Sequence, residues 1–306
     1  MKASITKRQL RSYREFLYVL PFIVMVAIFS YYPLYGWIYS FFSYKPPQSL
    51  SWTNYVGLKW FATLVSTEAK RAELWQVFMN TFVMSGITLT TSWIPMLFAV
   101  FLNEIKCMPF RKVVQTVTTL PNFISWVLVY SIAQSVFNST GLVNTVAMQL
   151  GLISAPIDYL KDSSHVYLTM WLWLTWKNLG WASIMYIAAI AGIDEELFEA
   201  ARVDGASRLK IIWHITIPSL LPTFFVLLMI NSANFLSNGM EQYYVFNNSF
   251  NTKYTEVLDL YVYNLATGNS SYSISTALSM FKSVISLMLL LFTNSLSKAV
   301  RGESFM

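Results

Sequence analysis

Cysteine and histidine are nearly absent from this chain of 306 residues. Cys107 is the only cysteine, which excludes an internal disulfide and a metal site built from thiolates. The two histidines, His165 and His214, lie far apart in the sequence, which argues against a histidine cluster for metal binding or catalysis. Glycine-rich phosphate loops are missing as well. We therefore expect no catalytic centre, no metal site and no cofactor on this chain.

Charge is also scarce, and hydrophobic residues take its place. Only 12% of the residues are charged, whereas 55% are hydrophobic and 17% are aromatic. This composition is typical of membrane proteins, in which aromatic belts lie at both bilayer surfaces. The formal net charge is +6, but the basic residues flank apolar runs. Their placement indicates membrane topology and argues against a nucleic-acid partner.

Six apolar runs approach or exceed the roughly 20 helical residues that cross a hydrocarbon core of about 30 Å. The first is too long for a signal peptide, so we expect it to stay uncleaved behind a cytoplasmic segment at 1–15. We predict an all-α membrane protein with one six-span domain over 16–306. The expected spans are 16–42, 80–102, 113–137, 166–190, 220–237 and 274–296.

The orientation follows from the distribution of lysine and arginine. With both termini inside, thirteen of these residues fall on the inner side and six in the outer segments. The positive-inside rule favours this arrangement. Lys177 and Lys282 fall within spans. This topology also places the long polar interruption at 194–218 in the cytoplasm.

That polar interruption predicts two short helices joined by a sharp turn. Asp194 can cap the first helix, and Gly205 can end it in the left-handed conformation. Ser207 can cap a second helix over 208–215, with Pro218 marking its end. By physical chemistry alone this elbow could lie passively in the headgroup layer, or it could project into a soluble partner.

The elbow resembles the EAA loop of ABC-importer permeases. Glu199-Ala200-Ala201, three residues, Gly205, nine residues and Ile215-x-Ile217-Pro218 match the pattern E-A-A-x3-G-x9-I-x-L-P. The single departure is Ile217 for leucine, which conserves volume. The resemblance implies the type I ABC-importer permease fold, with the elbow held in a cleft of a cytoplasmic ATPase. It further implies coupling roles for Glu199, Ala200, Ala201, Asp204, Gly205, Arg208, Ile215 and Pro218.

Other stretches extend the resemblance over nearly the whole chain. Val56–Phe61 is similar to the V-G-L-x-x-F segment that follows the first span of sugar permeases, and Asn80-Thr81 opens the second span as it does there. Four more stretches resemble a Gram-positive subgroup described as polysaccharide or lipoprotein-type permeases. They are 32–36, 239–247, 257–263 and 281–283.

The resemblance implies a transport subunit, not an enzyme. This chain would form half of a heterodimeric pore for oligosaccharide in the plasma membrane of a bacterium, by subgroup a Gram-positive one. The implied partners are a second, homologous permease, an ATPase dimer that holds ATP and Mg²⁺, and an extracytoplasmic sugar-binding lipoprotein. Glu199 would face a basic group on the ATPase, and Gly205 would permit the sharp turn.

Polar residues inside the spans are candidates for the substrate pathway, because polar groups at membrane depth usually face a wet cavity or another helix. Amides bond sugar hydroxyls in both directions, and flat rings cover the C–H faces of a pyranose. Helical spacing groups two sets: Trp173, Trp176, Lys177, Gly180 and Trp181 in the fourth span, and Asn231, Asn234, Asn238 and Glu241 in and after the fifth.

Alternatives remain for these residues and for the chain. The asparagines could bond neighbouring helices, the tryptophans could be belt residues, and Lys177 and Lys282 could snorkel or pair with the partner subunit. A permease for an amino acid, phosphate or metal ion stays open. So does a secondary transporter, which usually needs midplane carboxylates, and here Glu241 is the only candidate. A membrane-embedded enzyme would lack a catalytic cluster.

Overall fold

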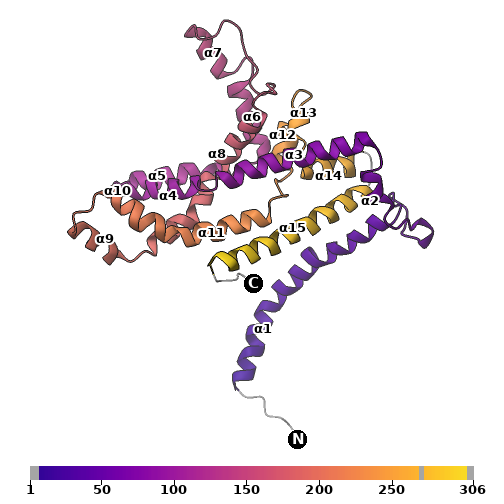
Figure 1. Ribbon diagram of the computed structural model, residues 1–306, viewed down its shortest axis with the longest axis horizontal. Helices are drawn as coiled ribbons and strands as arrows, with labels where there is room; N and C mark the ends of the chain where they lie inside the picture. Colours follow the sequence, from indigo (N-terminus) through magenta and orange to yellow (C-terminus); the bar gives the residue numbers. More distant parts are fainter. Residues whose placement is uncertain (1–6, 269–271, 302–306) are drawn as a thin grey trace. The chain divides into compact units, whose positions relative to one another are not determined.

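The computed structural model describes residues 7–268 and 272–301, and the regular structure in this part of the chain is helical (Figure 1). One isolated antiparallel β-bridge joins Phe42 to Tyr55. The chain divides into two compact units, 1–70 with 264–281 and 71–263 with 282–306. The α-helices are α1 (Lys7–Val26), α2 (Lys59–Leu64), α3 (Glu68–Thr90), α4 (Ile94–Glu104), α5 (Met108–Thr119), α6 (Trp126–Phe137), α7 (Leu142–Gln149), α8 (Val166–Ala191), α9 (Glu195–Val203), α10 (Arg208–Ile211), α11 (Ile217–Ala233), α12 (Glu241–Phe246), α13 (Thr252–Thr255), α14 (Leu258–Thr267) and α15 (Tyr272–Arg301).

The first unit contains α1, whose helix continues through a π-helical turn, Ala27–Tyr31, and a 3₁₀ segment, Tyr32–Phe41. The chain then folds back on itself, with the Val56 N–H bonded to the Phe41 carbonyl at 2.9 Å. Ser273 at the start of α15 donates to the Phe42 carbonyl at 2.7 Å. The stretch Val56–Phe61 therefore ends this short return and begins α2.

Four helices are long and apolar enough to cross a membrane: Arg14–Phe41, Glu68–Glu104, Arg208–Ala233 and Tyr272–Ser295. They overlap the predicted first, second, fifth and sixth spans. α8 agrees with the predicted fourth span in its bounds, but its tryptophans, Lys177 and Asn178 make it less apolar than these four. The count of six spans stays a prediction.

The predicted third span, 113–137, is wrong as a straight helix. Met108–Phe123 and Trp126–Gln149 meet at an angle of 108°. Pro121 lies in the 3₁₀ turn that ends the first half, and Ser125 caps α6 by accepting from the Leu128 N–H at 3.4 Å. A proline followed by a new capping residue ends one helix and starts another.

The helix that contains the start of the predicted second span begins before Asn80, at Glu68. Asn80 and Thr81, expected to open it, lie buried within α3. The Asn80 side chain donates to the carbonyls of Lys253 and Glu256 at 2.9 and 3.0 Å and accepts from the Tyr167 hydroxyl at 2.7 Å. A buried amide is costly unless it is bonded, and these bonds tie α3 to α8, to α13 and to Glu256 just after α13.

The second unit is held by close helix packing. α8 lies beside α4 and α5 (Figure 1), and Gly180 permits the approach to α5. A Cβ atom at Gly180 would overlap the backbone of Thr118 and Thr119. One core cluster is centred on Met84, Val129, Met170 and Phe246, and another on Val100, Tyr186 and Leu220.

Candidate functional site

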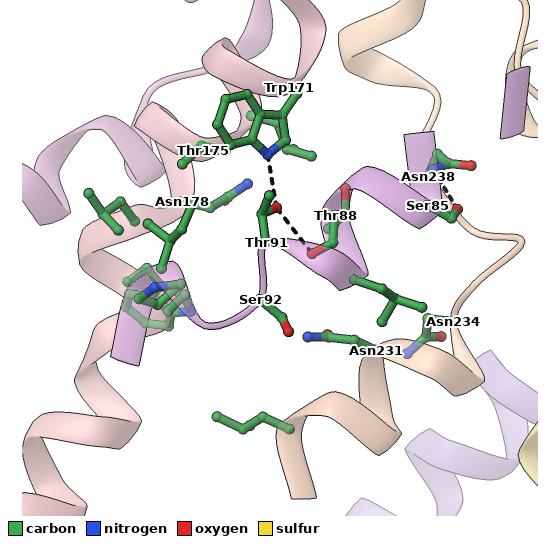
Figure 2. Close-up of a pocket in the computed structure, with 18 of the residues that line it drawn as sticks. Ser85, Thr88, Thr91, Ser92, Trp171, Thr175, Asn178, Asn231, Asn234 and Asn238 are labelled. Atoms are coloured by element: carbon green, nitrogen blue, oxygen red, sulfur yellow. Dashed lines mark hydrogen bonds between the residues drawn. The ribbon is translucent and has the colours of Figure 1, made fainter. Parts of the chain in front are cut away.

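A cavity of about 550 Å³ opens within the second unit (Figure 2). Three walls form it: the C-terminal part of α3 with the turn that follows, the middle of α8, and the end of α11 with the loop after it. Its size falls in the range of small-molecule sites. The described lining combines amides and hydroxyls with indole rings and aliphatic side chains.

The α3 wall consists of the hydroxyl residues Ser85, Thr88 and Thr91. Each donates its proton to a backbone carbonyl, Ser85 to Phe235, Thr88 to Met84 at 2.9 Å and Thr91 to Ile87 at 2.6 Å. The Thr91 oxygen also accepts from the Trp171 indole N–H at 2.9 Å (Figure 2). This wall therefore presents oxygen lone pairs to the cavity.

The α8 wall contains Trp171, Thr175, Asn178 and Trp181. These positions recur at intervals of three or four residues, so they share one face of the helix. The Asn178 carbonyl oxygen accepts from the Asn122 amide at 3.0 Å, across the bend between α5 and α6. That bond orients Asn178 and leaves its N–H groups available to a ligand.

The third wall brings together Asn231, Asn234 and Asn238, the three asparagines that the sequence spacing placed on one helical face. The physical basis differs from the one expected, because α11 ends at Ala233 and the last two lie beyond it. Asn238 donates to the Ser85 hydroxyl at 2.9 Å, and its own carbonyl oxygen is buried without a hydrogen-bond partner among the described residues. The hydroxyl of Ser92 is also buried without a hydrogen-bond partner among the described residues, and the side chain of Asn231 points toward it (Figure 2).

Four predicted pathway residues are not among those that line the cavity: Trp173, Trp176, Lys177 and Glu241. Trp173 packs on Phe137 and Phe246 in the core, with ring centroids 6.0 and 6.1 Å apart, and Trp176 stacks edge-on against Trp173. Glu241 is exposed at the start of α12. Of the side chains that the spacing grouped on α8, Trp181 lines the cavity, Lys177 is buried and Trp176 is exposed.

Lys177 is buried without a carboxylate in hydrogen-bonding contact. Its ammonium donates to the carbonyls of Pro121 and Asn122 at 3.2 and 2.7 Å and lies 5.5 Å from the centre of the Trp126 ring. Both carbonyls belong to the 3₁₀ turn Leu120–Phe123 at the bend, and the Pro121 carbonyl also accepts from the Ile124 N–H at 3.1 Å. Lys177 therefore caps the broken helix, which differs from the snorkelling or intersubunit pairing that the sequence suggested.

Sequence reasoning missed the hydroxyl wall of α3 and three residues of α8, namely Trp171, Thr175 and Asn178. A signal for them exists. Ser85, Thr88 and Thr91–Ser92 repeat every three residues within an apolar run, and the α8 residues repeat by four and three. A polar stripe of this kind marks a face turned away from lipid.

The elbow adopts the predicted first helix and turn. Asp194 accepts from the Glu196 N–H at 3.0 Å, which caps α9. Gly205 has φ of 70°, and the Ala206 N–H bonds back to the Ala201 carbonyl at 2.9 Å. A bond of this kind around a left-handed residue is the usual glycine ending of a helix.

The second half of the elbow differs from the prediction in two ways. Ser207 stands at the N-cap position of α10, but its side chain makes no capping hydrogen bond. Pro218 does not end the helix, which continues from Arg208 to Ala233 through a π-helical turn, Ile212–Thr216. The π-turn already interrupts the regular bonding pattern, so the missing N–H of proline is tolerated there.

The elbow is exposed, apolar side chains included. Glu199, Ala200, Asp204 and Arg208 are exposed, and the exposed fraction of Val203 reaches 87%. Leu209 and Trp213 are exposed at 69% and 64%. Among the described residues no group of three or more histidine, cysteine or carboxylate side chains could hold a metal, here or at the cavity.

Comparison with known proteins places this geometry in a family. The profile of the family described as "binding-protein-dependent transport system inner membrane component" matches residues 92–302, which include the elbow and most of the cavity. The chain belongs to this family. With its several long apolar helices, it is a multi-pass membrane protein and a transport subunit.

Relatives and solved structures agree with the assignment. The chain is 32% identical to Protein LplB of Bacillus subtilis over 94% of its own length and 89% of the relative's. It is 33% identical to the polygalacturonan/rhamnogalacturonan transport system permease protein YteP of the same organism, over 94% and 88%. The crystal structure of a bacterial ABC transporter involved in import of the acidic polysaccharide alginate matches with a TM-score of 0.83 at 32% identity, over 96% of this chain and 98% of that one.

Proposed function

We propose that this permease is one half of a heterodimeric pore in an ATP-driven importer for carbohydrate, in particular for oligosaccharides derived from a complex polysaccharide. The observation that carries the proposal is the cavity of about 550 Å³, lined by amides, hydroxyls and indole rings, in a chain of this family. Amides and hydroxyls suit sugar hydroxyls, and ring faces suit the C–H faces of a pyranose. The substrate pathway then includes Trp181, Asn231, Asn234 and Asn238.

The cavity gives no support to an ion-coupled secondary transporter. Ion coupling usually depends on carboxylates at membrane depth, and none of the described residues that line the cavity is acidic. Energy must then come from another subunit. We assign that role to a separate cytoplasmic ATPase dimer with bound ATP and Mg²⁺.

The elbow is the proposed contact with the ATPase. Exposed apolar residues beside charges, as at Val203, Asp204 and Arg208, suit a surface that a soluble partner covers. In this arrangement Glu199 faces a basic group, and Gly205 supports the turn. The positions proposed to carry coupling are Glu199, Ala200, Ala201, Asp204, Gly205, Arg208, Ile215 and Pro218.

The proposal includes a place in the cell. The chain lies in the plasma membrane of a bacterium, by subgroup resemblance a Gram-positive one, with both termini and the elbow in the cytoplasm. An extracytoplasmic lipoprotein delivers the sugar. One related solved structure holds a bacterial alginate ABC transporter in complex with an alginate pentasaccharide-bound periplasmic protein, which supports a partner of this kind; it matches this chain with a TM-score of 0.84 at 31% identity.

Co-purification with matched variants at Gly205 tests the proposal. The chain is expressed with its partner permease and candidate ATPases, and retained ATPase is quantified for the natural chain, Gly205→Val and Gly205→Asn. Position 205 has φ of 70° and open space around a Cβ atom, so only backbone preference separates the variants. Asparagine tolerates this conformation and valine does not.

We expect the natural chain and Gly205→Asn to retain the ATPase. Gly205→Val should retain at least about fivefold less ATPase, since backbone strain of this kind costs roughly 1–3 kcal/mol. Retention by Gly205→Val at the natural level would refute the elbow contact. Failure of every candidate ATPase to bind the natural chain would refute the importer.

A further inference from the structure

The cavity contains no charge. None of the described residues that line it is a lysine, arginine, aspartate or glutamate. A sugar acid brings a carboxylate for each uronate residue, and taking a carboxylate out of water is costly unless a cation or strong donors receive it. The absence of a lining cation therefore bears directly on which sugars the cavity can hold.

The two lysines within the predicted spans cannot supply that cation as they stand. Lys177 is 7% exposed and donates to the carbonyls of Pro121 and Asn122. Lys282 forms an ion pair with Asp259, whose other carboxylate oxygen accepts from the Gly239 N–H at 2.9 Å. Moving either ammonium to the cavity would break bonds to partly or fully buried groups.

The α3 wall adds an electrostatic argument of its own. Ser85, Thr88 and Thr91 have given their protons to backbone carbonyls, so their oxygens act as acceptors toward the cavity. The unpartnered carbonyl oxygen of Asn238 is a further acceptor beside them. Acceptors bind the O–H of a sugar hydroxyl, whereas an ionised carboxylate has no proton to donate.

Neutral donors remain on the facing walls, as a sugar requires. Asn178 has free side-chain N–H groups because Asn122 donates to its carbonyl oxygen, and the side chain of Asn231 makes no hydrogen bond among the described residues. Sugar hydroxyls both donate and accept, so they can use both kinds of wall. An ionised carboxylate can use only the donors, and it gains no hydrogen bond from the acceptors of α3.

We propose that this cavity selects uncharged sugar residues and disfavours uronates. The inference rests on the proposed function and deepens it. The related transporter of the same fold imports alginate, which is described as an acidic polysaccharide.

The test compares acids with neutral sugars of the same length. The complex of both permeases and the ATPase, without the binding protein, is placed in lipid nanodiscs, and binding is measured by equilibrium dialysis of end-labelled tetrasaccharides. One set is neutral: gluco-, xylo-, arabino- and galacto-oligosaccharides and methyl-esterified oligogalacturonide. The other is acidic: free oligogalacturonide and oligoalginate. The two galacturonide forms share length, linkage and stereochemistry and differ in charge.

We expect at least one neutral sugar to bind ten or more times tighter than any acid. Equal or tighter binding of an acid would overturn the inference and leave carbohydrate import standing. If no sugar of either set binds, and none enters proteoliposomes that contain the binding protein, the proposed function falls and the inference with it. The two failures are thus distinct.

Variants at Asn231 locate the selection in the cavity. Asn231→Lys should shift the ratio of acid to neutral affinity at least tenfold toward the acid, and Asn231→Glu should shift it the other way. Asn231→Gln adds length without charge and should change both affinities alike. An unchanged ratio in the lysine and glutamate variants, with the natural preference for neutral sugars intact, would show that charge is sensed elsewhere and would overturn the assignment to this cavity.

Discussion

The elbow and the cavity are built by opposite means. The elbow is set by neighbours in sequence: Asp194 caps α9, and Gly205 turns the chain eleven residues later. The cavity is set by residues far apart in sequence, with Asn238 bonded to Ser85 and Trp171 bonded to Thr91. One region depends on local backbone preference, and the other on how three helices pack.

The two regions also differ in burial. No residue of α9 or α10 is buried, which suits the proposed contact with a soluble partner. The cavity lies between helices whose other faces are packed, as at Met84 of α3 and Met170 of α8. A change in the elbow should thus alter docking without altering stability, and a change behind the cavity should alter both folding and sugar binding. The following variants test this division between an elbow that affects docking and a cavity that affects folding and sugar binding.

Gly180→Ala should have the largest effect. The added methyl group would overlap the backbone of Thr118 and Thr119, which no side-chain movement can relieve. Overpacking of this kind costs about 3 kcal/mol or more when backbone must move. We expect a large fall in the thermal unfolding temperature of the purified permease pair and loss of sugar binding.

Gly86→Ala is the matched control, because it lies within α3 and a Cβ atom there would meet no other atom within 4 Å. It should be neutral or slightly stabilising, since alanine favours a helix by roughly 0.5–1 kcal/mol over glycine. Equal unfolding temperatures for the two variants would contradict the close packing of α8 on α5.

The same division explains what the sequence could predict. Caps, the glycine turn and the apolar runs are local patterns, and the structure confirms Asp194, Gly205 and the bounds of α8. The grouping of residues on α8 was equally local. Which side of that helix meets the cavity depends on α5 and α6, and no pattern within α8 contains that information.

The bend after Pro121 shows a second limit. The apolar run at 113–137, with a proline near its start, predicts one kinked span, but the chain turns by 108° there. The turn is stabilised by Lys177, which lies more than fifty residues away and donates to the carbonyls of Pro121 and Asn122. Helical spacing in the sequence made that lysine a candidate pathway residue. Its actual partners are backbone carbonyls, and no residue type in the sequence marks them as partners of a lysine.

Thr91→Val should have an intermediate effect, confined to the cavity. Valine keeps the shape of threonine but removes the acceptor for the Trp171 N–H. A net loss of about 1 kcal/mol from one hydrogen bond corresponds to roughly fivefold weaker sugar binding. We expect the KM for uptake to rise by that factor, with kcat and ATPase retention unchanged.

The neighbouring residue supplies the control. Thr90 is exposed and bonds only within its own helix, with its hydroxyl donating to the Gly86 carbonyl at 2.8 Å. Thr90→Val should leave the KM at the natural value. A comparable rise in KM for both variants would mean that any such change in α3 weakens uptake. It would contradict a specific role for the hydroxyl of Thr91 in the cavity.

Asp194→Ala should have the smallest effect, confined to the elbow. The carboxylate accepts from the Glu196 N–H at 3.0 Å, and loss of an N-cap costs about 1 kcal/mol of helix stability. We expect faster hydrogen exchange at the first amides of α9 and a reduction of a few fold in retained ATPase, while the unfolding temperature and the KM for sugar stay constant. Asp194→Asn keeps an acceptor at the cap and should behave as the natural chain. A change in KM in the alanine variant without loss of ATPase would contradict the separation of elbow and cavity. It would mean that the first turn of α9 acts on the cavity directly and not through the docked partner.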